Sequence, residues 1–179
     1  SDGVIISSSN GGATWVTQTS PTTQRLLDVA TVDINTVVAV GTNGTIVRTS
    51  NGGTTWTIQE SGTTATLGGI DFVDDRFYSC QQPCSHESAG WVVGENGLIL
   101  KTTDSGETWS LQGDGLTGNF LYDVNVVDRS QAWAVGASGT ILHTSDGGSN
   151  WEQQESGTSA YLLAADFLDS GNGYAVGVM

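Results

Sequence analysis

The sequence predicts an all-β protein built from repeated four-stranded antiparallel units, and two observations carry that prediction. The first is composition: of 179 residues, 25 are glycine and only 13% are charged, while Ser and Thr are abundant. The second is a repeat, because Trp15, Trp56, Trp109 and Trp151 lie 41, 53 and 42 residues apart. A period of about 40 residues holding four strands is the size of one propeller blade. We therefore expect a single β-propeller domain with four blade equivalents.

Each period contains four short apolar segments separated by Gly, Asn, Asp or Ser clusters, which is typical of antiparallel strands joined by tight turns. The first segment begins with Leu, the second ends in a motif such as "VAVG" (38–41) or "WVVG" (91–94), the third begins with Gly as in "GTIVRT" (44–49), and the fourth follows the Trp. This order predicts three whole blades and two half-blades. The blades are residues 26–61, 67–113 and 120–156, and the half-blades are residues 1–19 and 162–179.

The two half-blades are complementary, since residues 162–179 supply the first two strands of a blade and residues 1–19 supply the last two. Their pairing would close a ring of four blades and remove the exposed sheet edges. The same arrangement also fits a piece of a larger propeller, such as a seven-bladed one. The sequence leaves both possibilities open.

An eight-residue box ends at each repeated Trp, as in "TSNGGTTW" (49–56) and "TTDSGETW" (102–109). Asn or Asp at the third position can accept hydrogen bonds from nearby backbone N–H groups, and Gly at the fifth can adopt the positive φ of a tight turn. The Trp ring would cover the end of the blade, with its N–H able to find an acceptor. We therefore expect the box to be structural. Its residues are Asn10, Gly12, Trp15, Asn51, Gly53, Trp56, Asp104, Gly106, Trp109, Asp146, Gly148 and Trp151.

The box resembles the Asp-box, or BNR repeat, of sialidases, sortilin-type receptors and many other propellers; Asn150 departs from the Thr of that pattern. The longer units "GWVVGENGLILKTTDSGETW" (90–109) and "SGTSAYLLAADFLDSGNGYAVG" (156–177) are similar to repeats of the photosystem II assembly and stability factor family. This resemblance covers essentially the whole chain. It implies a protein-binding propeller of the thylakoid lumen, typically seven-bladed, with a patch of arginines that contacts the partner. The arginines of this chain are not matched to that patch; they are Arg25, Arg48, Arg76 and Arg129.

Charge restricts the possible partners, because five Lys and Arg against 19 Asp and Glu give a formal net charge of -14. Such a chain repels nucleic acid and anionic membrane surfaces. No run of 18 apolar residues is present, and "SDGVIISSSN" at the start lacks the pattern of a signal peptide. We expect an extracytoplasmic protein, in the thylakoid lumen or otherwise periplasmic or secreted; if a targeting peptide existed, it has been removed.

The insertion in the second whole blade, residues 75–90 ("DRFYSCQQPCSHESAG"), is the one asymmetric feature of the repeat. It joins the first two strands of its blade and should lie beside the box turns. We expect a disulfide between Cys80 and Cys84; a zinc site with His86 lacks an evident fourth ligand. Because variable loops carry recognition, we predict that the insertion binds the partner. Its candidate residues are Arg76, Phe77, Tyr78 and His86.

Two further sets of residues recur once per repeat. Arg48, Lys101, His143 and Ser7 share one position of the third strand, where they are either solvated separately or form a docking ring for an acidic partner segment, so Arg48 and Lys101 are partner-binding candidates. An acidic residue also follows the first strand of each repeat. These acids are expected to cap turns, since no calcium-loop spacing accompanies them; they are Asp33, Asp74, Asp128 and Asp169.

The function that the sequence favours is non-catalytic binding of a protein complex, with no cofactor, no metal, no small-molecule substrate and no insertion into the membrane. Loops 59–66 and 113–119 would join the insertion in recognition. The alternative is a carbohydrate-binding or adhesion module using Tyr78, Phe120, Tyr122 and Tyr161. A sialidase-like glycosidase is remote, because the arginines are scattered and the acids repeat in every blade. Asn43 lies in a glycosylation sequon, "NGT", that is better explained as a hairpin turn.

Overall fold

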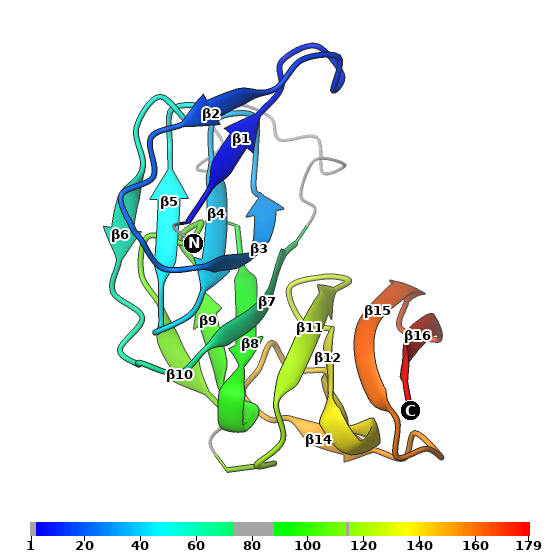
Figure 1. The fold of residues 1–179 in the computed structure, drawn as a ribbon. Coiled ribbons are helices and arrows are strands. Elements are labelled where there is room, and N and C mark those ends of the chain that lie inside the picture. Colours follow the sequence, from blue (N-terminus) through cyan, green and yellow to red (C-terminus); the bar gives the residue numbers. More distant parts are fainter. Residues whose placement is uncertain (1–2, 74–87, 114) are drawn as a thin grey trace, which may run out of the picture.

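A computed structural model describes residues 3–73, 88–113 and 115–179 and confirms the all-β fold. The described strands form three four-stranded and two two-stranded antiparallel sheets, each arranged as a blade or half-blade of a propeller (Figure 1). None of the helices in the described residues is long and apolar enough to cross a membrane.

The strands follow the order expected from the repeat. The first half-blade contains β1 (Ile5–Ser7) and β2 (Val16–Gln18), and the second contains β15 (Tyr161–Asp169) and β16 (Asn172–Val178). In each whole blade the strands pair in sequence order from the inside to the outside. The whole blades are β3 (Leu26–Thr31), β4 (Val37–Gly41), β5 (Ile46–Thr49) and β6 (Thr57–Gln59); β7 (Leu67–Phe72), β8 (Gly90–Gly94), β9 (Ile99–Thr102) and β10 (Ser110–Gln112); and β11 (Leu121–Val126), β12 (Ala132–Gly136), β13 (Ile141–Thr144) and β14 (Glu152–Gln154).

Short turns join the second and third strands of the whole blades. In the first whole blade Asn43 and Gly44 both have positive φ (57° and 65°), as a two-residue hairpin of the mirror-image type requires. The predicted hairpin turn at the "NGT" sequon is therefore confirmed. The equivalent turns of the other two blades are the short 3₁₀ segments η2 (Glu95–Gly97) and η3 (Ala137–Gly139).

The blades form an open arc, so four-bladed closure, one of the two arrangements that the sequence left open, does not occur in this structure. The sheets β1-β2 and β15-β16 stay separate, and the N- and C-terminal ends lie on different sides of the arc (Figure 1). Consecutive inner strands β3, β7, β11 and β15 contact one another, and this packing sets the rotation from each blade to the next. That rotation is too small for four blade equivalents to complete a circle.

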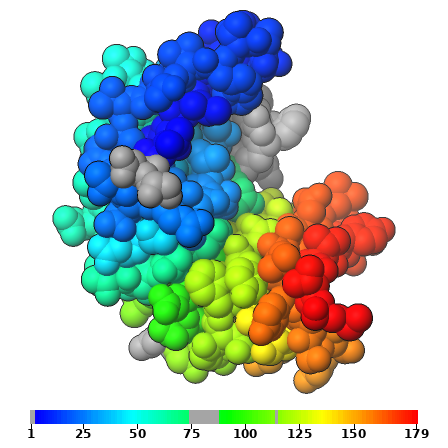
Figure 2. Space-filling model, in the orientation of Figure 1, coloured from blue at the N-terminus to red at the C-terminus, as the bar shows by residue number. Residues whose placement is uncertain are grey.

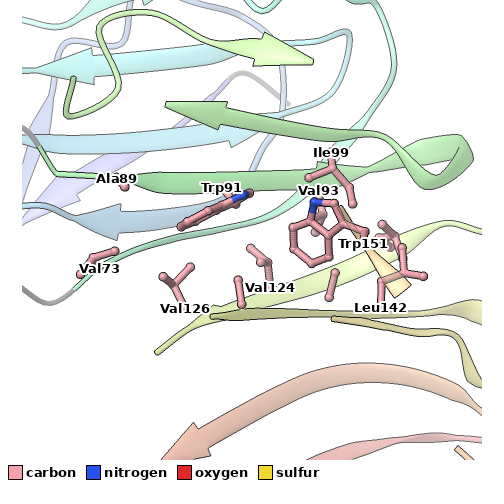
Figure 3. Packing of buried hydrophobic residues seen from close by; sticks show 12 residues of the cluster. Val73, Ala89, Trp91, Val93, Ile99, Val124, Val126, Leu142 and Trp151 are labelled. Atoms are coloured by element: carbon pink, nitrogen blue, oxygen red, sulfur yellow. The ribbon is translucent and has the colours of Figure 1, made fainter. Parts of the chain in front are cut away.

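The hydrophobic core lies between blades rather than within them. One cluster joins the second and third whole blades, with Trp91 and Val93 of β8 packed toward Val124 of β11 and the ring of Trp151 (Figure 3). A second cluster joins the first and second whole blades through residues such as Val38 and Leu100. Each blade therefore depends on its neighbours for burial of its apolar faces, as in other repeat architectures.

Candidate functional site

The box turns adopt the structural role that the sequence predicts. In the box at 49–56, the Thr49 hydroxyl donates to Asn51 Oδ1 (3.0 Å) and accepts from the Gly53 N–H (3.0 Å), while Asn51 Oδ1 also accepts from the Thr55 N–H (2.9 Å). The same three bonds recur in the other boxes, including the one where Asn150 replaces Thr. The box glycines have φ between 81° and 86°. Every polar group that repeats in the box thus serves the turn.

The box Trp packs against the preceding blade where the structure has one, which the sequence did not predict. Trp151 is 5% exposed and lies beside Ile99 and Val93 of the blade before it, whereas Trp15, which has no blade before it in this structure, is 60% exposed. The expected indole hydrogen bond is present at Trp109, whose Nε1 donates to Gly106 O (3.2 Å). At Trp56 and Trp151 the buried Nε1 has no acceptor among the described residues, so that part of the prediction is wrong there.

Arg48 and Lys101 bond to the next blade. Arg48 Nε donates to Ser105 O (2.9 Å), and Lys101 Nζ donates to Gly147 O (2.5 Å); both acceptors directly precede the glycine of the next box. Lys101 also lies over the ring of Trp91, at 5.0 Å from its centroid. Burial lowers the pKa of Lys101, while the charge of Asp146 opposes that shift. The docking role of these cations stays a prediction, but the structure gives them an internal role that neither sequence interpretation foresaw.

His143 and Ser7, which share this third-strand position with Arg48 and Lys101, make different contacts. His143 Nε2 lies 2.8 Å from Gln131 Oε1, and its ring stacks on Trp133 at 4.3 Å between centroids. Burial lowers the pKa of His143, and the charge of Glu152 opposes the shift. The Ser7 hydroxyl accepts a hydrogen bond from Gln18 Nε2 (2.8 Å). His143 is followed only by β15 and β16, a half-blade without a box turn, whereas Ser7 lines one hollow with Gly52 of the box turn in the next blade.

Carboxylates on the inner strands join consecutive blades, and the sequence analysis missed them. Asp28 Oδ2 accepts from the Ile70 N–H (2.8 Å), and Asp71 Oδ2 accepts from the Val126 N–H (2.7 Å). Asp123 Oδ2 bonds the Ala165 N–H in the same way (2.8 Å). The signal that could have revealed them is acidic residues two or four positions after the Leu of each first strand. A partly buried carboxylate at these positions needs a donor, and only a neighbouring inner strand can supply one.

The inner carboxylates have raised pKa values because they are partly buried. Burial raises the pKa of Asp71 to about 6, against the lowering effect of hydrogen bonds from the Val126 and Phe72 amides. Burial likewise raises the pKa of Asp28 and of Asp123. Asp71 lies at a polar hollow of about 350 Å³ where β3 and β7 end, lined also by Thr31 and Ile70. In the part of the chain that the structure describes, no group of three or more His, Cys, Asp or Glu is placed to hold a metal ion.

The acids that follow the first strands cap turns, as predicted for three of the four. Asp33 Oδ1 accepts from the Asn35 and Thr36 amides (2.7 and 2.9 Å), and Asp128 Oδ1 accepts from the Ser130 and Gln131 amides (2.6 and 2.8 Å). Asp169 Oδ1 accepts from the Gly171 N–H (2.8 Å). Asp74 lies outside the described residues.

Most of the predicted partner-binding insertion lies outside the described residues. This applies to Arg76, Phe77, Tyr78, Cys80, Cys84 and His86, so the expected disulfide and recognition residues stay predictions. The described flank shows where the insertion joins the fold: the Ser88 N–H donates to Ser105 Oγ (2.9 Å), and the Ser105 N–H donates to Ser88 O (3.0 Å). Ser88, where the described chain resumes, therefore lies beside the box turn of its own blade, and the position of the insertion itself stays a prediction.

The loops predicted to act with the insertion lie at the other end of the strands. In loop 59–66, Ala65 O accepts from the Gly44 N–H (2.8 Å) of the turn between the second and third strands, and the Thr66 N–H donates to Glu95 Oε2 (3.1 Å). Since strands one to four alternate in direction, these turns lie opposite the box turns. Loop 113–119 begins at the same end of its strand, after β10. The two loops therefore lie at the opposite end of the strands from Ser88, where the described chain resumes after the insertion.

An aromatic row lies on the inter-blade loop side of the inner strands. Phe120 stacks on Tyr122 at 4.8 Å between centroids, and Tyr122 lies 6.4 Å from Tyr161 of the next blade. Tyr122 is the extra residue of a β-bulge in β11, a feature that redirects a side chain. Phe120 and Tyr122 are half-buried, and Tyr161 is 48% exposed. This row brings together three of the four aromatics that the sequence singled out; Tyr78 lies outside the described residues.

Comparison with known protein families agrees with this architecture. The family model described as photosynthesis system II assembly factor YCF48 matches residues 7–116 and 113–179. The chain belongs to this YCF48 family. The resemblance seen in the repeats is thereby confirmed. A comparison with curated proteins gave no match.

Solved structures show the same fold at low sequence identity. A structure of YCF48 bound to D1 peptide is 26% identical, with a TM-score of 0.67, over 88% of this chain and 49% of the other. YCF48 from Cyanidioschyzon merolae is 24% identical, with a TM-score of 0.65, over 89% of this chain and 52% of the other. GH74 from Niastella koreensis shares the fold at 19% identity, with a TM-score of 0.59, over 79% of this chain and 24% of the other. The chain thus spans about half the length of the YCF48 structures that it matches.

Proposed function

We propose that this chain is a non-catalytic photosystem II assembly factor that binds an extended peptide segment of a photosystem II protein. The observation that carries the proposal is the family match together with the 26% identical relative that was solved with D1 peptide. A propeller suits such binding because its repeated strands form a rigid frame and its inner surface and loops are free to vary.

The aromatic row is the part of this chain that we assign to the peptide. Phe120, Tyr122 and Tyr161 offer large rigid surfaces from two neighbouring blades, and aromatic side chains are enriched where proteins bind one another. Phe120 directly precedes β11, Tyr122 lies in β11 and Tyr161 begins β15, so the row lies at the same end of two neighbouring inner strands. A peptide lying along this row would contact the third whole blade and the second half-blade at once.

Peptide binding can be measured by fluorescence anisotropy with labelled D1 peptide and a scrambled peptide of the same composition. We expect the chain to bind D1 peptide more tightly, and we expect Tyr122→Ala and Tyr161→Ala each to weaken binding about tenfold or more, as for aromatic hot spots. The matched control is Leu111→Ala, which removes an apolar side chain, 55% exposed, from the outer strand β10. Equal affinity for both peptides would refute the proposal.

The competing carbohydrate-binding function uses the same aromatic row, because sugars also stack on aromatic rings. A glycan array therefore complements the peptide assay. Glycan binding that is lost in Tyr122→Ala, together with no D1 peptide binding, would favour the competing class.

The lack of catalysis that we propose is supported by how the inner carboxylates are bonded. A glycosidase of the usual kind needs two carboxyl groups that reach the sugar. Both oxygens of Asp71 instead accept backbone amides, from Phe72 (2.8 Å) and Val126 (2.7 Å), and both oxygens of Asp28 accept the Val29 and Ile70 amides. The Niastella koreensis GH74 structure is 19% identical and is similar in fold alone.

We propose the thylakoid lumen as the location, in association with a membrane protein complex. The acidic composition and the family agree with this proposal. Protease protection of the tagged protein in intact thylakoids, lost when the membranes are opened, would support it. Digestion in intact thylakoids would contradict it.

A further inference from the structure

The aromatic row is held in place by a glycine of the neighbouring inner strand. Each inner strand has a β-bulge at the same position, where β11 carries Tyr122 and β7 carries Gly68. A Cβ at Gly68 would lie 2.7 Å from Phe120 Cε1, so the Phe120 ring covers the β7 backbone where a side chain would otherwise stand. Phe120 therefore spans the second and third whole blades, and Tyr122, stacked on it at 4.8 Å, is positioned by the same contact.

Among the described residues, a parallel ring covers only one face of Tyr122. Phe120 stacks on that face, whereas the centroid of Tyr161 lies 6.4 Å away and its ring is tilted by 46°, so Tyr161 does not lie flat on Tyr122. The face of an aromatic ring is negative, and it attracts a cation that lies within about 6 Å of its centroid. The protein makes this contact internally, where Lys101 Nζ lies 5.0 Å from the centroid of the Trp91 ring.

Two carboxylates accompany the aromatic row. Glu95 begins η2, which contacts β11, and its Oε2 accepts the Thr66 N–H (3.1 Å) just before β7. On the surface, the bright green segment around η2 adjoins the yellow-green start of the third whole blade, which in turn adjoins the orange second half-blade (Figure 2). Asp123 directly follows Tyr122 in β11, and its Oδ2 accepts the Ala165 N–H (2.8 Å). A carboxylate that accepts one hydrogen bond can accept more, so a cationic donor at the row would find partners.

The positive side chains of these two blades lie at the opposite end of the strands. In the described residues of the second and third whole blades, the Lys and Arg residues are Lys101 and Arg129. Lys101 Nζ is bonded to Gly147 O of a box turn, and Arg129 lies in the turn that pairs with the same box. At the end of the strands where the aromatic row lies, the described charged residues of the two blades are both acidic. They are Glu95 and Glu155.

We propose that the aromatic row binds a basic peptide segment, with an Arg or Lys side chain of the peptide over the Tyr122 ring and the carboxylates of Glu95 and Asp123 adding to the attraction. This inference rests on the proposed peptide-binding function and names the chemistry of the segment. Charges of opposite sign steer the peptide to this end of the strands, and the ring holds the cation once the two are in contact. An acidic segment would meet carboxylates there and be repelled.

Three labelled synthetic peptides of equal length test this charge preference: an Arg-Leu-Gly repeat, a Gln-Leu-Gly repeat and a Glu-Leu-Gly repeat. We expect fluorescence anisotropy to show that the Arg peptide binds about tenfold more tightly than the Gln peptide, because only the Arg peptide gains the ring contact and the attraction of the carboxylates. The Glu peptide should bind most weakly. Added salt should narrow the difference between the Arg and Gln peptides, because it screens exposed charges.

Matched variants show whether the preference belongs to the row. Glu95→Gln keeps an oxygen for the Thr66 N–H but removes the charge, and should reduce the preference for Arg over Gln about two- to fivefold. Glu107→Gln removes an exposed acid from the box turn of the same blade, at the other end of the strands, and should leave the preference unchanged. Tyr122→Leu keeps an apolar side chain without a ring, and should weaken binding of the Arg peptide more than binding of the Gln peptide.

The outcomes separate this inference from the proposed function. Circular dichroism checks that each variant is folded, and Glu95→Gln decides the matter if Tyr122→Leu is not. Equal binding of the Arg and Gln peptides, or a preference that Glu107→Gln reduces as much as Glu95→Gln does, would overturn the inference, while selective binding of D1 peptide would still support peptide binding. Selective binding of the Arg peptide without binding of D1 peptide would instead refute the proposed partner and leave the preference of the row for basic peptides intact.

Discussion

Asp71 shows how a single buried carboxylate couples the inner strands to pH. Its pKa is raised from 3.8 to about 6 by burial, so between these values the folded chain holds a proton that the unfolded chain has released. Raising the pH through this window therefore favours unfolding, and the free energy of unfolding should fall by up to about 3 kcal/mol. Chemical denaturation from pH 4 to pH 7 measures the slope.

Asp71→Asn provides the control for this pH dependence. The amide oxygen can still accept the Val126 N–H, but the side chain no longer titrates. We expect a shallower loss of stability between pH 4 and pH 6, with a residual slope from Asp28 and Asp123, whose pKa values are also raised. An unchanged slope would mean that Asp71 does not titrate in this window.

Lys101 makes a contact between blades whose contribution to stability can also be tested by a single substitution. Lys101→Met keeps an apolar stem over the Trp91 ring but removes the bond to Gly147 O, and should lower the free energy of unfolding by about 1 to 2 kcal/mol. Arg25→Met removes a cation from an exposed site and should have little effect. If both variants unfold at the same denaturant concentration as the parent chain, the Lys101 bond does not stabilise the blade interface.

At the scale of the element, the box turn combines a backbone requirement with a contact to another blade. A Cβ at Gly106, where φ is 81°, would lie 2.8 Å from Val38 Cγ2 of the preceding blade; a Cβ at Gly62, where φ is 73°, would meet nothing within 4 Å. Gly62→Ala should therefore cost only the strain of the left-handed region, about 1 to 2 kcal/mol. Gly106→Ala should cost about 1 to 3 kcal/mol more, because it also overpacks the interface.

Thermal unfolding of the two alanine variants separates the cost of backbone strain from the cost of overpacking the interface. Equal shifts in Tm would show that the preceding blade accommodates the added methyl group without loss of stability. The box glycine would then be required only for the backbone conformation of its own turn. A larger shift for Gly106→Ala would identify the box as a joint between blades.

Local elements could be predicted from the sequence because their determinants lie close together in the chain. The box places Thr49, Asn51 and Gly53 within five residues, so its turn is specified by side chains that reach their own backbone. The turn caps of Asp33 and Asp128 follow the same logic. The bond from Arg48 to Ser105 spans 57 positions, and no local pattern indicates it.

At the scale of the whole molecule, the sequence could count blades but could not predict whether they close. The number of periods gives the strands, whereas the rotation between blades depends on packing such as that of Asp71 against the β11 backbone. The candidate site was predicted only in part for the same reason. Phe120, Tyr122 and Tyr161 were recognised as aromatics near loops, but their assembly into one row depends on how the third whole blade meets the second half-blade.

An arc held together by contacts between neighbouring blades should be least stable at its ends. The amides of β8 and β12, whose residues are all buried, are enclosed by blades on both sides, whereas all residues of β16 are exposed. Local opening is easiest where few apolar contacts must be broken. Hydrogen exchange of this chain should therefore be fastest in β1, β2, β15 and β16 and slowest in β8 and β12. Uniform protection along the chain would contradict stability by nearest-neighbour packing.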